Sequence, residues 1–273
     1  MRWENNFCTR NNTIAALFLL LILSCSGCAQ KPWGISLEEK EYDSALRLAN
    51  EMADNNSQCL RSIHTDLTVE YVTPLEKRSF SGYLLYSPPA SYKFVISNPL
   101  GQPLFIIAGN QNKYQVINTL ETKYIAGGMT SFALRNQLPI HFLKGRWDDW
   151  LTGKNTISTE YITDISLDRQ SRGIWFTFED NTGAKNISHL LVDPEKKVIL
   201  EHVLDTRNKK SLATIDYSDY LQDQSCLQPQ NIYISGLDYG TTIRFQLADT
   251  ELVAEIKTYS LNPPQGYLRQ IRP

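Results

Sequence analysis

The sequence predicts an α+β protein that is mainly β, with a curved antiparallel sheet, an N-terminal helix and a short helical lid. Three observations support this fold class. Apolar residues recur at helical spacing near residues 36–53, and from residue 67 to residues 253–261 they alternate with polar residues in many short runs. Turn-forming clusters separate these runs, which is typical of an antiparallel meander. An aromatic-rich helical segment, residues 129–151, interrupts the pattern.

The N-terminal end is predicted to be a signal peptide, residues 1–27. Its apolar run, residues 14–23, would span about 15 Å as a helix, roughly half of the hydrocarbon core of a bilayer. The small residues that follow resemble the lipobox of bacterial lipoproteins. They favour Cys28 as the residue that carries the lipid anchor, because Gly27 precedes it. Palmitate would be part of this anchor. Cys25 is the alternative anchor.

Residues 28–35 would then form a lipidated tether, and residues 36–273 suit a single domain. The sequence carries 27 basic and 29 acidic side chains, so its charge gives no argument for binding nucleic acid. Cleavage before Cys28 leaves Cys59 and Cys226 as the other cysteines. In an oxidising periplasm such a pair usually forms a disulfide, and two buried free thiols are the alternative.

A helix is expected to begin at Ser36, which would form a capping box with Glu39, and to end in residues 54–57. One face of this helix is apolar and has to pack against the sheet. The apolar residues are Tyr42, Ala45, Leu46, Ala49, Met52 and Ala53.

Two strands joined by a turn are expected around Pro99, Leu100 and Gly101. Apolar residues alternate with others before this turn, at residues 92–96, and are continuous after it, at residues 104–107. Leu100 is unusual, because a large aliphatic side chain at a turn tip gains nothing from contact with water. It needs either a pocket or a membrane.

The helical lid holds two tryptophans three residues apart, and such large apolar groups must be covered. They could fill an open sheet as a plug, or lid and sheet could enclose an apolar cavity large enough for acyl chains. From the alternation of the strands, the predicted cavity residues are Tyr92, Phe94, Ile96, Leu104, Ile106, Phe142, Trp147, Trp150 and Leu151.

Motifs for catalysis are absent from the sequence, which has no Gly-x-Ser-x-Gly elbow, no phosphate-binding glycine loop and no His-Glu-x-x-His. His189 and His202 flank one predicted turn and could face each other, but such a pair is more often structural than metal-binding. We therefore expect no enzyme activity, no cofactor and no metal site.

Several segments resemble the LolB family of outer-membrane lipoproteins, which receive other lipoproteins from the periplasmic carrier LolA. The segments are residues 92–101 (YKFVISNPLG), Tyr124, residues 138–140 and residues 150–153, in the same order and spacing. The resemblance implies an antiparallel half-barrel with a helical lid and an apolar cavity for acyl chains. It also gives Leu100 the position of a protruding leucine that the family needs for membrane transfer.

This chain departs from the LolB pattern toward its C-terminus. It is longer after the lid and ends in an extension, residues 262–267, that is more like LolA-like lipoproteins. Fold therefore transfers better than activity. The residue after Cys28 is Ala29 rather than aspartate, which by resemblance to known sorting signals implies the outer membrane.

Together these observations predict a lipid-anchored protein on the periplasmic face of the outer membrane. It would bind lipoprotein acyl chains in an apolar cavity and help to insert them in the outer membrane. Its partners would be those chains and a periplasmic LolA-like carrier. The alternative is a structural lipoprotein of an envelope or secretion assembly that binds a protein partner without lipid transfer.

Overall fold

The computed structural model describes residues 31–59, 61–135, 147–154, 158–179, 186–208, 210–223 and 226–272. One compact unit begins at Trp33 and contains every helix, strand and core cluster described below. It has its own hydrophobic core and is therefore a self-contained folding unit. The predicted signal peptide, Cys28 and Phe142 lie outside the described residues.

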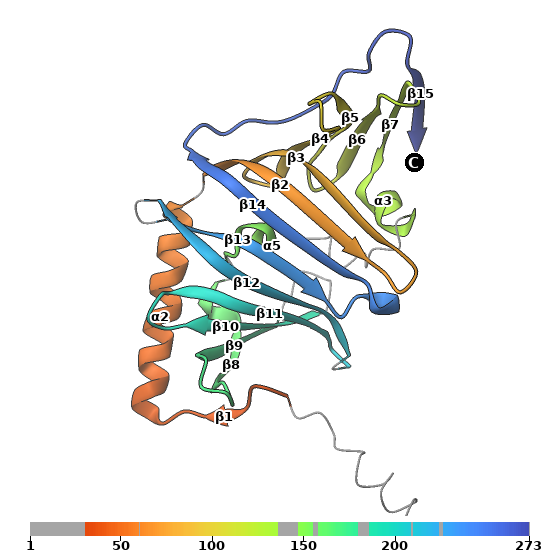
Figure 1. The fold of residues 1–273 in the computed structure, drawn as a ribbon. Helices are drawn as coiled ribbons and strands as arrows, with labels where there is room; N and C mark the ends of the chain where they lie inside the picture. Colours follow the sequence, from red (N-terminus) through yellow and green to blue (C-terminus); the bar gives the residue numbers. More distant parts are fainter. Residues whose placement is uncertain are drawn as a thin grey trace, which may run out of the picture. The chain divides into compact units, whose positions relative to one another are not determined.

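A single sheet dominates this unit (Figure 1). Within the described residues it has fifteen strands in the order β1-β8-β9-β10-β11-β12-β13-β14-β2-β3-β4-β5-β6-β7-β15. Neighbouring strands are antiparallel, except that β15 runs parallel to β7. The predicted mainly β, antiparallel fold is thereby confirmed. The strands are β1 (Ile35–Ser36), β2 (Ser62–Val72), β3 (Lys77–Ser87), β4 (Ser91–Ser97), β5 (Pro103–Gly109), β6 (Lys113–Asn118), β7 (Lys123–Gly128), β8 (Ile162–Leu167), β9 (Ile174–Glu179), β10 (Asn186–Asp193), β11 (Val198–Thr206), β12 (Ser211–Asp223), β13 (Cys226–Ser235), β14 (Thr242–Val253) and β15 (Leu268–Arg272).

The long helix α2 (Glu39–Gln58) begins later than the sequence predicted. Ser36 instead belongs to β1, which pairs with β8. The backbone N–H of Glu38 donates to Glu41 Oε2 at 3.0 Å, so the capping box is formed by Glu38 and Glu41 and not by Ser36 and Glu39. Within the described part of the chain, no helix is long and apolar enough to cross a membrane.

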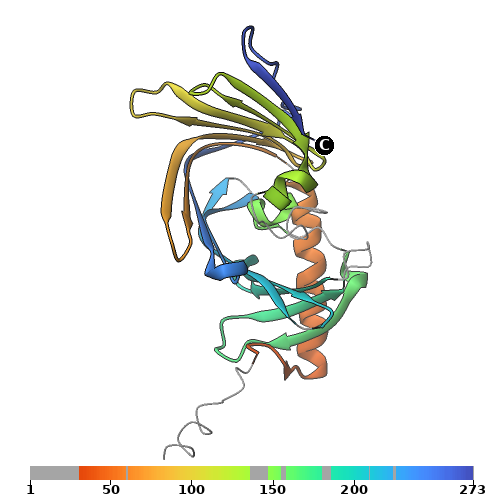
Figure 2. The same cartoon turned by 90° about the vertical axis from the view of Figure 1, so that its right-hand side faces the viewer.

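We call the sheet face that α2 covers the inner face. Ala45, Leu48 and Met52 of α2 are buried there in one core cluster with side chains from β8–β14, β2 and β3. Figure 2 shows the sheet bending around α2 and the short helices α3 (Met129–Arg135) and α5 (Trp147–Thr152). This arrangement is stable because the helix stripe and the sheet remove each other's apolar surface from water.

The opposite, outer face is crossed by residues 254–261, which we call the strap. The sequence predicted a strand through this segment, but β14 ends at Val253. The strap instead bonds to polar side chains of the sheet. The backbone N–H of Lys257 donates to Ser87 Oγ at 2.8 Å, and that of Tyr259 donates to Ser91 Oγ at 2.9 Å. These bonds satisfy two buried hydroxyls and hold the strap across β3 and β4.

The end of the strap is held by Gln115 of β6. Its Oε1 accepts from the backbone N–H of Leu261 at 2.9 Å, and its Nε2 donates to the carbonyl of Leu261 at 3.0 Å. Beneath the strap, Ala108, Ile117 and Tyr124 form a second core cluster with Leu261. Both faces of β5–β7 therefore carry apolar side chains, as buried strands do.

Cys59 and Cys226 form the predicted disulfide. Cys59 caps the C-terminus of α2, and Cys226 is the first residue of β13. Their Cα atoms are 5.5 Å apart, a separation that suits a disulfide. The bond ties the inner-face helix to the middle of the sheet, so the alternative of two free thiols does not apply.

Candidate functional site

The turn between β4 and β5 is held by one side chain, that of Asn98. Its Oδ1 accepts from the backbone N–H groups of Leu100 and Gln102, both at 3.0 Å, and its amide donates to Gln102 Oε1 at 3.1 Å. Gly101 has a φ of +78°, a left-handed conformation that favours glycine. Its backbone N–H donates to the carbonyl of Asn98 at 2.9 Å. The turn therefore presents Leu100 in one fixed position.

Leu100 is 84% exposed at the tip of this turn, and Pro99 and Gly101 beside it are exposed as well. A large aliphatic side chain that is held in water by several hydrogen bonds suggests a contact surface rather than a core position. The contact of this turn with a membrane stays a prediction.

Three of the predicted cavity residues share the inner face. Tyr92, Phe94 and Ile96 alternate along β4, and the first two pack against the core cluster under α2. The Tyr92 hydroxyl lies 3.9 Å from Met129 Sδ in α3, and burial raises the pKa of Tyr92 to about 12. This phenol is therefore neutral at physiological pH and adds no charge to the inner face.

Leu104 and Ile106 do not join this group, which corrects the predicted cavity. The register places Ile107, not Ile106, opposite Phe94. Because side chains alternate along a strand, Ile106 points to the outer face, where it packs under the strap. Leu104 lies at a register shift and has no partner residue in β4. The inner face of β5 presents Phe105 and Ile107 instead.

The helix α5 supplies three of the predicted lid residues, and Trp147 is its first residue. The ring of Trp150 lies 5.6 Å from that of Phe245 in β14. Leu151 is buried, and its carbonyl accepts from Gln228 Nε2 at 3.3 Å. This helix therefore packs on β13 and β14, in the core cluster that also includes the inner face of β4.

An open hollow of about 600 Å³ lies where the β2–β3 turn, the end of α3 and the loop after β13 meet. A second cavity, under α2, has a volume of only about 20 Å³ because the helix fills its side of the sheet. The described residues that line the larger hollow are Tyr71, Thr73, Pro74, Leu75, Glu76, Arg135, Tyr239 and Thr241. No sequence pattern points to these residues, because three segments far apart in the chain contribute them.

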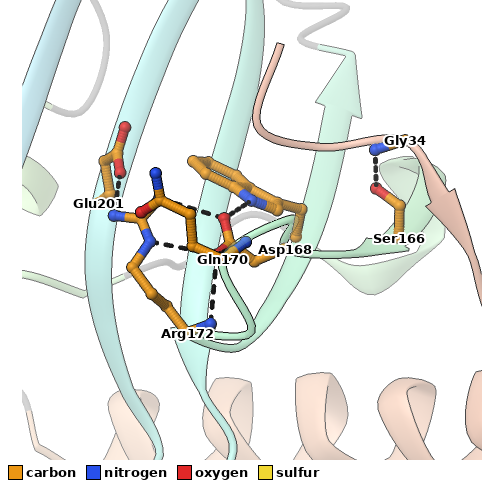
Figure 3. A network of polar contacts seen from close by, with 7 residues as sticks. Gly34, Ser166, Asp168, Gln170, Arg172 and Glu201 are labelled. Atoms are coloured by element: carbon orange, nitrogen blue, oxygen red, sulfur yellow. Dashed lines mark hydrogen bonds and ion pairs between the residues drawn. The ribbon is translucent and has the colours of Figure 1, made fainter. Parts of the chain in front are cut away.

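The N-terminal segment docks on the outer face at the far end of the sheet. The ring of Trp33 stacks on His189 with centroids 4.0 Å apart and lies 5.1 Å from the ring of Trp175. The backbone N–H of Gly34 donates to Ser166 Oγ at 3.1 Å (Figure 3). These contacts fix the point at which the predicted tether enters the sheet.

A polar network lies close to this point, around the buried carboxylate of Asp168. In Figure 3, Arg172 lies between Asp168 and Glu201. Its guanidinium nitrogens are 3.1 Å from Asp168 Oδ1 and 2.9 Å from Glu201 Oε2, and Trp175 Nε1 donates to Asp168 Oδ1 at 2.9 Å. Burial acts to raise the pKa of Asp168, but hydrogen bonds from Arg172 and Trp175 hold that pKa below its usual value. Burial and the neighbouring Glu201 raise the pKa of Asp216 to about 6. The network braces the β8–β9 turn.

The two histidines singled out in the sequence do not face each other. In the β10–β11 pair, His202 is opposite Leu190 and His189 is opposite Val203, so the two rings point to opposite faces. His189 Nδ1 lies 2.9 Å from Thr177 Oγ1. Burial, together with the charge of His189, lowers the pKa of His202 to about 4. Among the described residues, no group of histidine, cysteine or carboxylate side chains is placed to hold a metal ion.

Comparisons with known proteins give matches among solved structures only. No protein-family model and no curated protein matches the sequence. The structure is similar to an outer membrane lipoprotein-sorting protein domain from Vibrio parahaemolyticus, at 9% identity over 78% of this chain and 93% of that chain, with a TM-score of 0.48. It is also similar to a LolA superfamily protein from Nitrosomonas europaea, at 13% identity over 78% and 94% of the two chains, with a TM-score of 0.47.

A DUF1329 family protein from Desulfovibrio piger matches with a TM-score of 0.52, at 9% identity over 79% of this chain and 94% of that chain. Identities this low concern the fold alone. This chain and the D. piger protein therefore share a fold.

Proposed function

We propose that the mature protein is an envelope lipoprotein, anchored through Cys28, that binds the acyl chains of other lipoproteins and helps to insert them in the outer membrane. The observation that supports this most is an apolar inner face on β4–β6 in the same strands as a turn that holds Leu100 in solvent. The LolB resemblance of residues 92–101 agrees with it.

The inner face of β4–β6 suits hydrocarbon. Its partly buried apolar side chains include Phe94, Ile96, Phe105, Ile107 and Val116, and Asn118 at the end of β6 adds a polar one. In these three strands, all of whose residues are described, no inner-face position carries a charged side chain. Each CH₂ group that moves from water onto such a surface contributes about 0.8 kcal/mol. Binding of one or two chains therefore needs no charge partner.

The proposed activity requires no covalent step. A periplasmic LolA-like carrier would deliver the acyl chains, the inner face would hold them, and Leu100 would enter the bilayer surface to begin release. Leu100 suits this role because it lies outside the core, so that changing it leaves the inner face intact.

The test is a transfer assay that uses acyl-loaded protein and outer-membrane vesicles, with the variant Leu100→Glu. We expect this variant to bind an acyl probe with unchanged affinity and to stop releasing it to the vesicles, because a charged tip is costly to place in hydrocarbon. Unchanged transfer by Leu100→Glu would remove the turn from the mechanism.

One observation favours the alternative, a structural lipoprotein that binds a protein partner. Among the described residues, β15 pairs with β7 alone and leaves one edge of the sheet available for another strand. Mass spectrometry of protein purified without added lipid separates the two functions. Co-purified acyl chains would support the acyl-binding function. Protein that carries no lipid and does not bind a fluorescent fatty acid would support the structural role.

A further inference from the structure

At the edge of the sheet formed by the ends of β4–β7 and the start of β15, three elements each expose a leucine. Leu100 lies on the β4–β5 turn, Leu120 lies on the β6–β7 turn, and Leu268 is the first residue of β15. Their exposed fractions are 84%, 67% and 58%. We call these three residues the leucine row.

The strand register places the three leucines side by side. Ser97 is opposite Pro103 at the end of β4, and Asn118 is opposite Lys123 at the end of β6. Lys123 is in turn level with Leu268. Because neighbouring strands lie about 4.8 Å apart, the tips of these two adjacent hairpins are roughly 10 Å apart. The row therefore follows the ends of β4–β7 and β15.

Hydrogen bonds join the elements that carry the row. Thr119 links the two hairpins, because its Oγ1 donates to the carbonyl of Pro103 at 2.7 Å and its backbone N–H donates to the carbonyl of Leu104 at 3.0 Å. The backbone N–H of Leu268 donates to the carbonyl of Thr122 at 2.9 Å. The three leucines are thus presented by one braced edge and not by independent loops.

We propose that the leucine row is a contact surface for a lipid bilayer, in which Leu120 and Leu268 insert together with Leu100. The proposed function already places Leu100 in the bilayer surface, and this inference adds two further leucines to that contact. Only the part that concerns Leu100 rests on the proposed function. The contact of the other two leucines does not depend on whether the inner face holds acyl chains.

A bilayer fits this surface better than a protein does, for two reasons. The leucines project from three separate elements, two turns and the start of β15, with polar residues between them. A protein partner would need a separate pocket for each, whereas fluid lipid closes around each one. One of the cations beside the row is also neutralised, because Lys123 Nζ pairs with Glu121 Oε2 at 2.5 Å. Burial of apolar surface, and not attraction to anionic lipid, would therefore drive the contact.

The row is specific to this edge of the sheet. Leu75 on the β2–β3 turn is more exposed, at 96%, but β3 pairs with β4 only from Gly82 onward. The five preceding residues of β3 carry the β2–β3 turn roughly 17 Å beyond the level of Ile96. Leu75 is therefore a matched control with the same side chain on a similar turn elsewhere.

The test is co-sedimentation of unlipidated protein, residues 29–273, with vesicles of phosphatidylcholine alone and with added phosphatidylglycerol. The variants are Leu100→Ser, Leu120→Ser, Leu268→Ser and the control Leu75→Ser. Full burial of a leucine corresponds to roughly a tenfold or greater gain in partitioning. We expect each row variant to lower vesicle partitioning several-fold to tenfold, Leu75→Ser to leave it unchanged, and salt to have little effect.

Three outcomes would overturn the proposal: no binding of the parent protein to vesicles, parent-like binding by Leu120→Ser and Leu268→Ser, or an equal loss for Leu75→Ser. Binding only to anionic vesicles with a strong salt dependence would also contradict it. The proposed function is tested separately by acyl-probe titration of the same variants. A variant that keeps acyl binding but loses vesicle binding is impaired only in the leucine row. A variant that loses acyl binding is impaired in the inner face.

Discussion

Loss of the disulfide between Cys59 and Cys226 is predicted to have a large effect on stability. The two residues are 167 positions apart in the sequence, and the bond joins the end of α2 to the start of β13. Without the bond, the unfolded chain regains the conformational freedom of that loop. For this length, chain entropy gives a loss of roughly 5 kcal/mol in the free energy of unfolding.

Urea unfolding measures this loss in oxidised protein, in protein reduced with dithiothreitol and in the double variant Cys59→Ser, Cys226→Ser. If the slope of the unfolding free energy is about 3 kcal/mol per molar urea, the midpoint should fall by nearly 2 M. The reduced parent protein separates loss of the bond from the cost of placing serine at two buried positions. A fall of less than about 1 kcal/mol in the reduced parent would refute the chain-entropy reasoning.

Three further predictions concern single residues. Asn98→Ala should release the turn and speed hydrogen exchange at the amide of Leu100, at a cost of about 1 kcal/mol, because that amide loses its acceptor; unchanged exchange would show that the glycine alone fixes the turn. Gly82→Ala should destabilise the protein by about 3 kcal/mol in thermal melts, since its Cβ would lie 1.8 Å from the carbonyl oxygen of Val95; a stability equal to that of the parent would contradict the close approach of β3 and β4. The pKa of His202 is lowered to about 4, so between pH 6.5 and 4 the unfolded chain binds a proton that the folded protein does not. The stability of the parent protein should therefore fall as pH drops through this window. In melts at several pH values, His202→Gln should reduce the dependence of stability on pH. An equal pH dependence in the two proteins would show that a group other than His202 causes the fall.

The sequence was sufficient to predict which side chains of a strand share a face where the local pattern and the burial agree. The alternation of Tyr92, Phe94 and Ile96 places them on one face because only one face of β4 is lined by apolar side chains along its length. The disulfide was also predictable, since the predicted cleavage before Cys28 would leave Cys59 and Cys226 as the other cysteines.

The sequence was not sufficient where a distant segment changes the environment of a strand. Residues 104–107 are apolar at every position because the strap covers their outer face, so alternation could not tell Ile106 from Ile107. The strap lies more than a hundred residues further along the chain, and no pattern in residues 104–107 predicts that it packs there. Ser36 was misassigned for a similar reason, because pairing of β1 with β8 removes it from the helix. Leu120 could have been found by the argument used for Leu100, since both are large aliphatic residues in turns.

Ile106 and Ile107 allow the most direct test of the proposed inner-face site, since they are consecutive, chemically identical and on opposite faces of β5. The measurement is a titration of an environment-sensitive acyl probe into residues 29–273, for the parent, Ile107→Gln and Ile106→Gln. The proposed function predicts saturable binding by the parent, a several-fold or greater loss of affinity in Ile107→Gln, and parent-like affinity in Ile106→Gln. Absence of saturable binding by the parent, or equal losses in the two variants, would contradict an acyl-binding inner face.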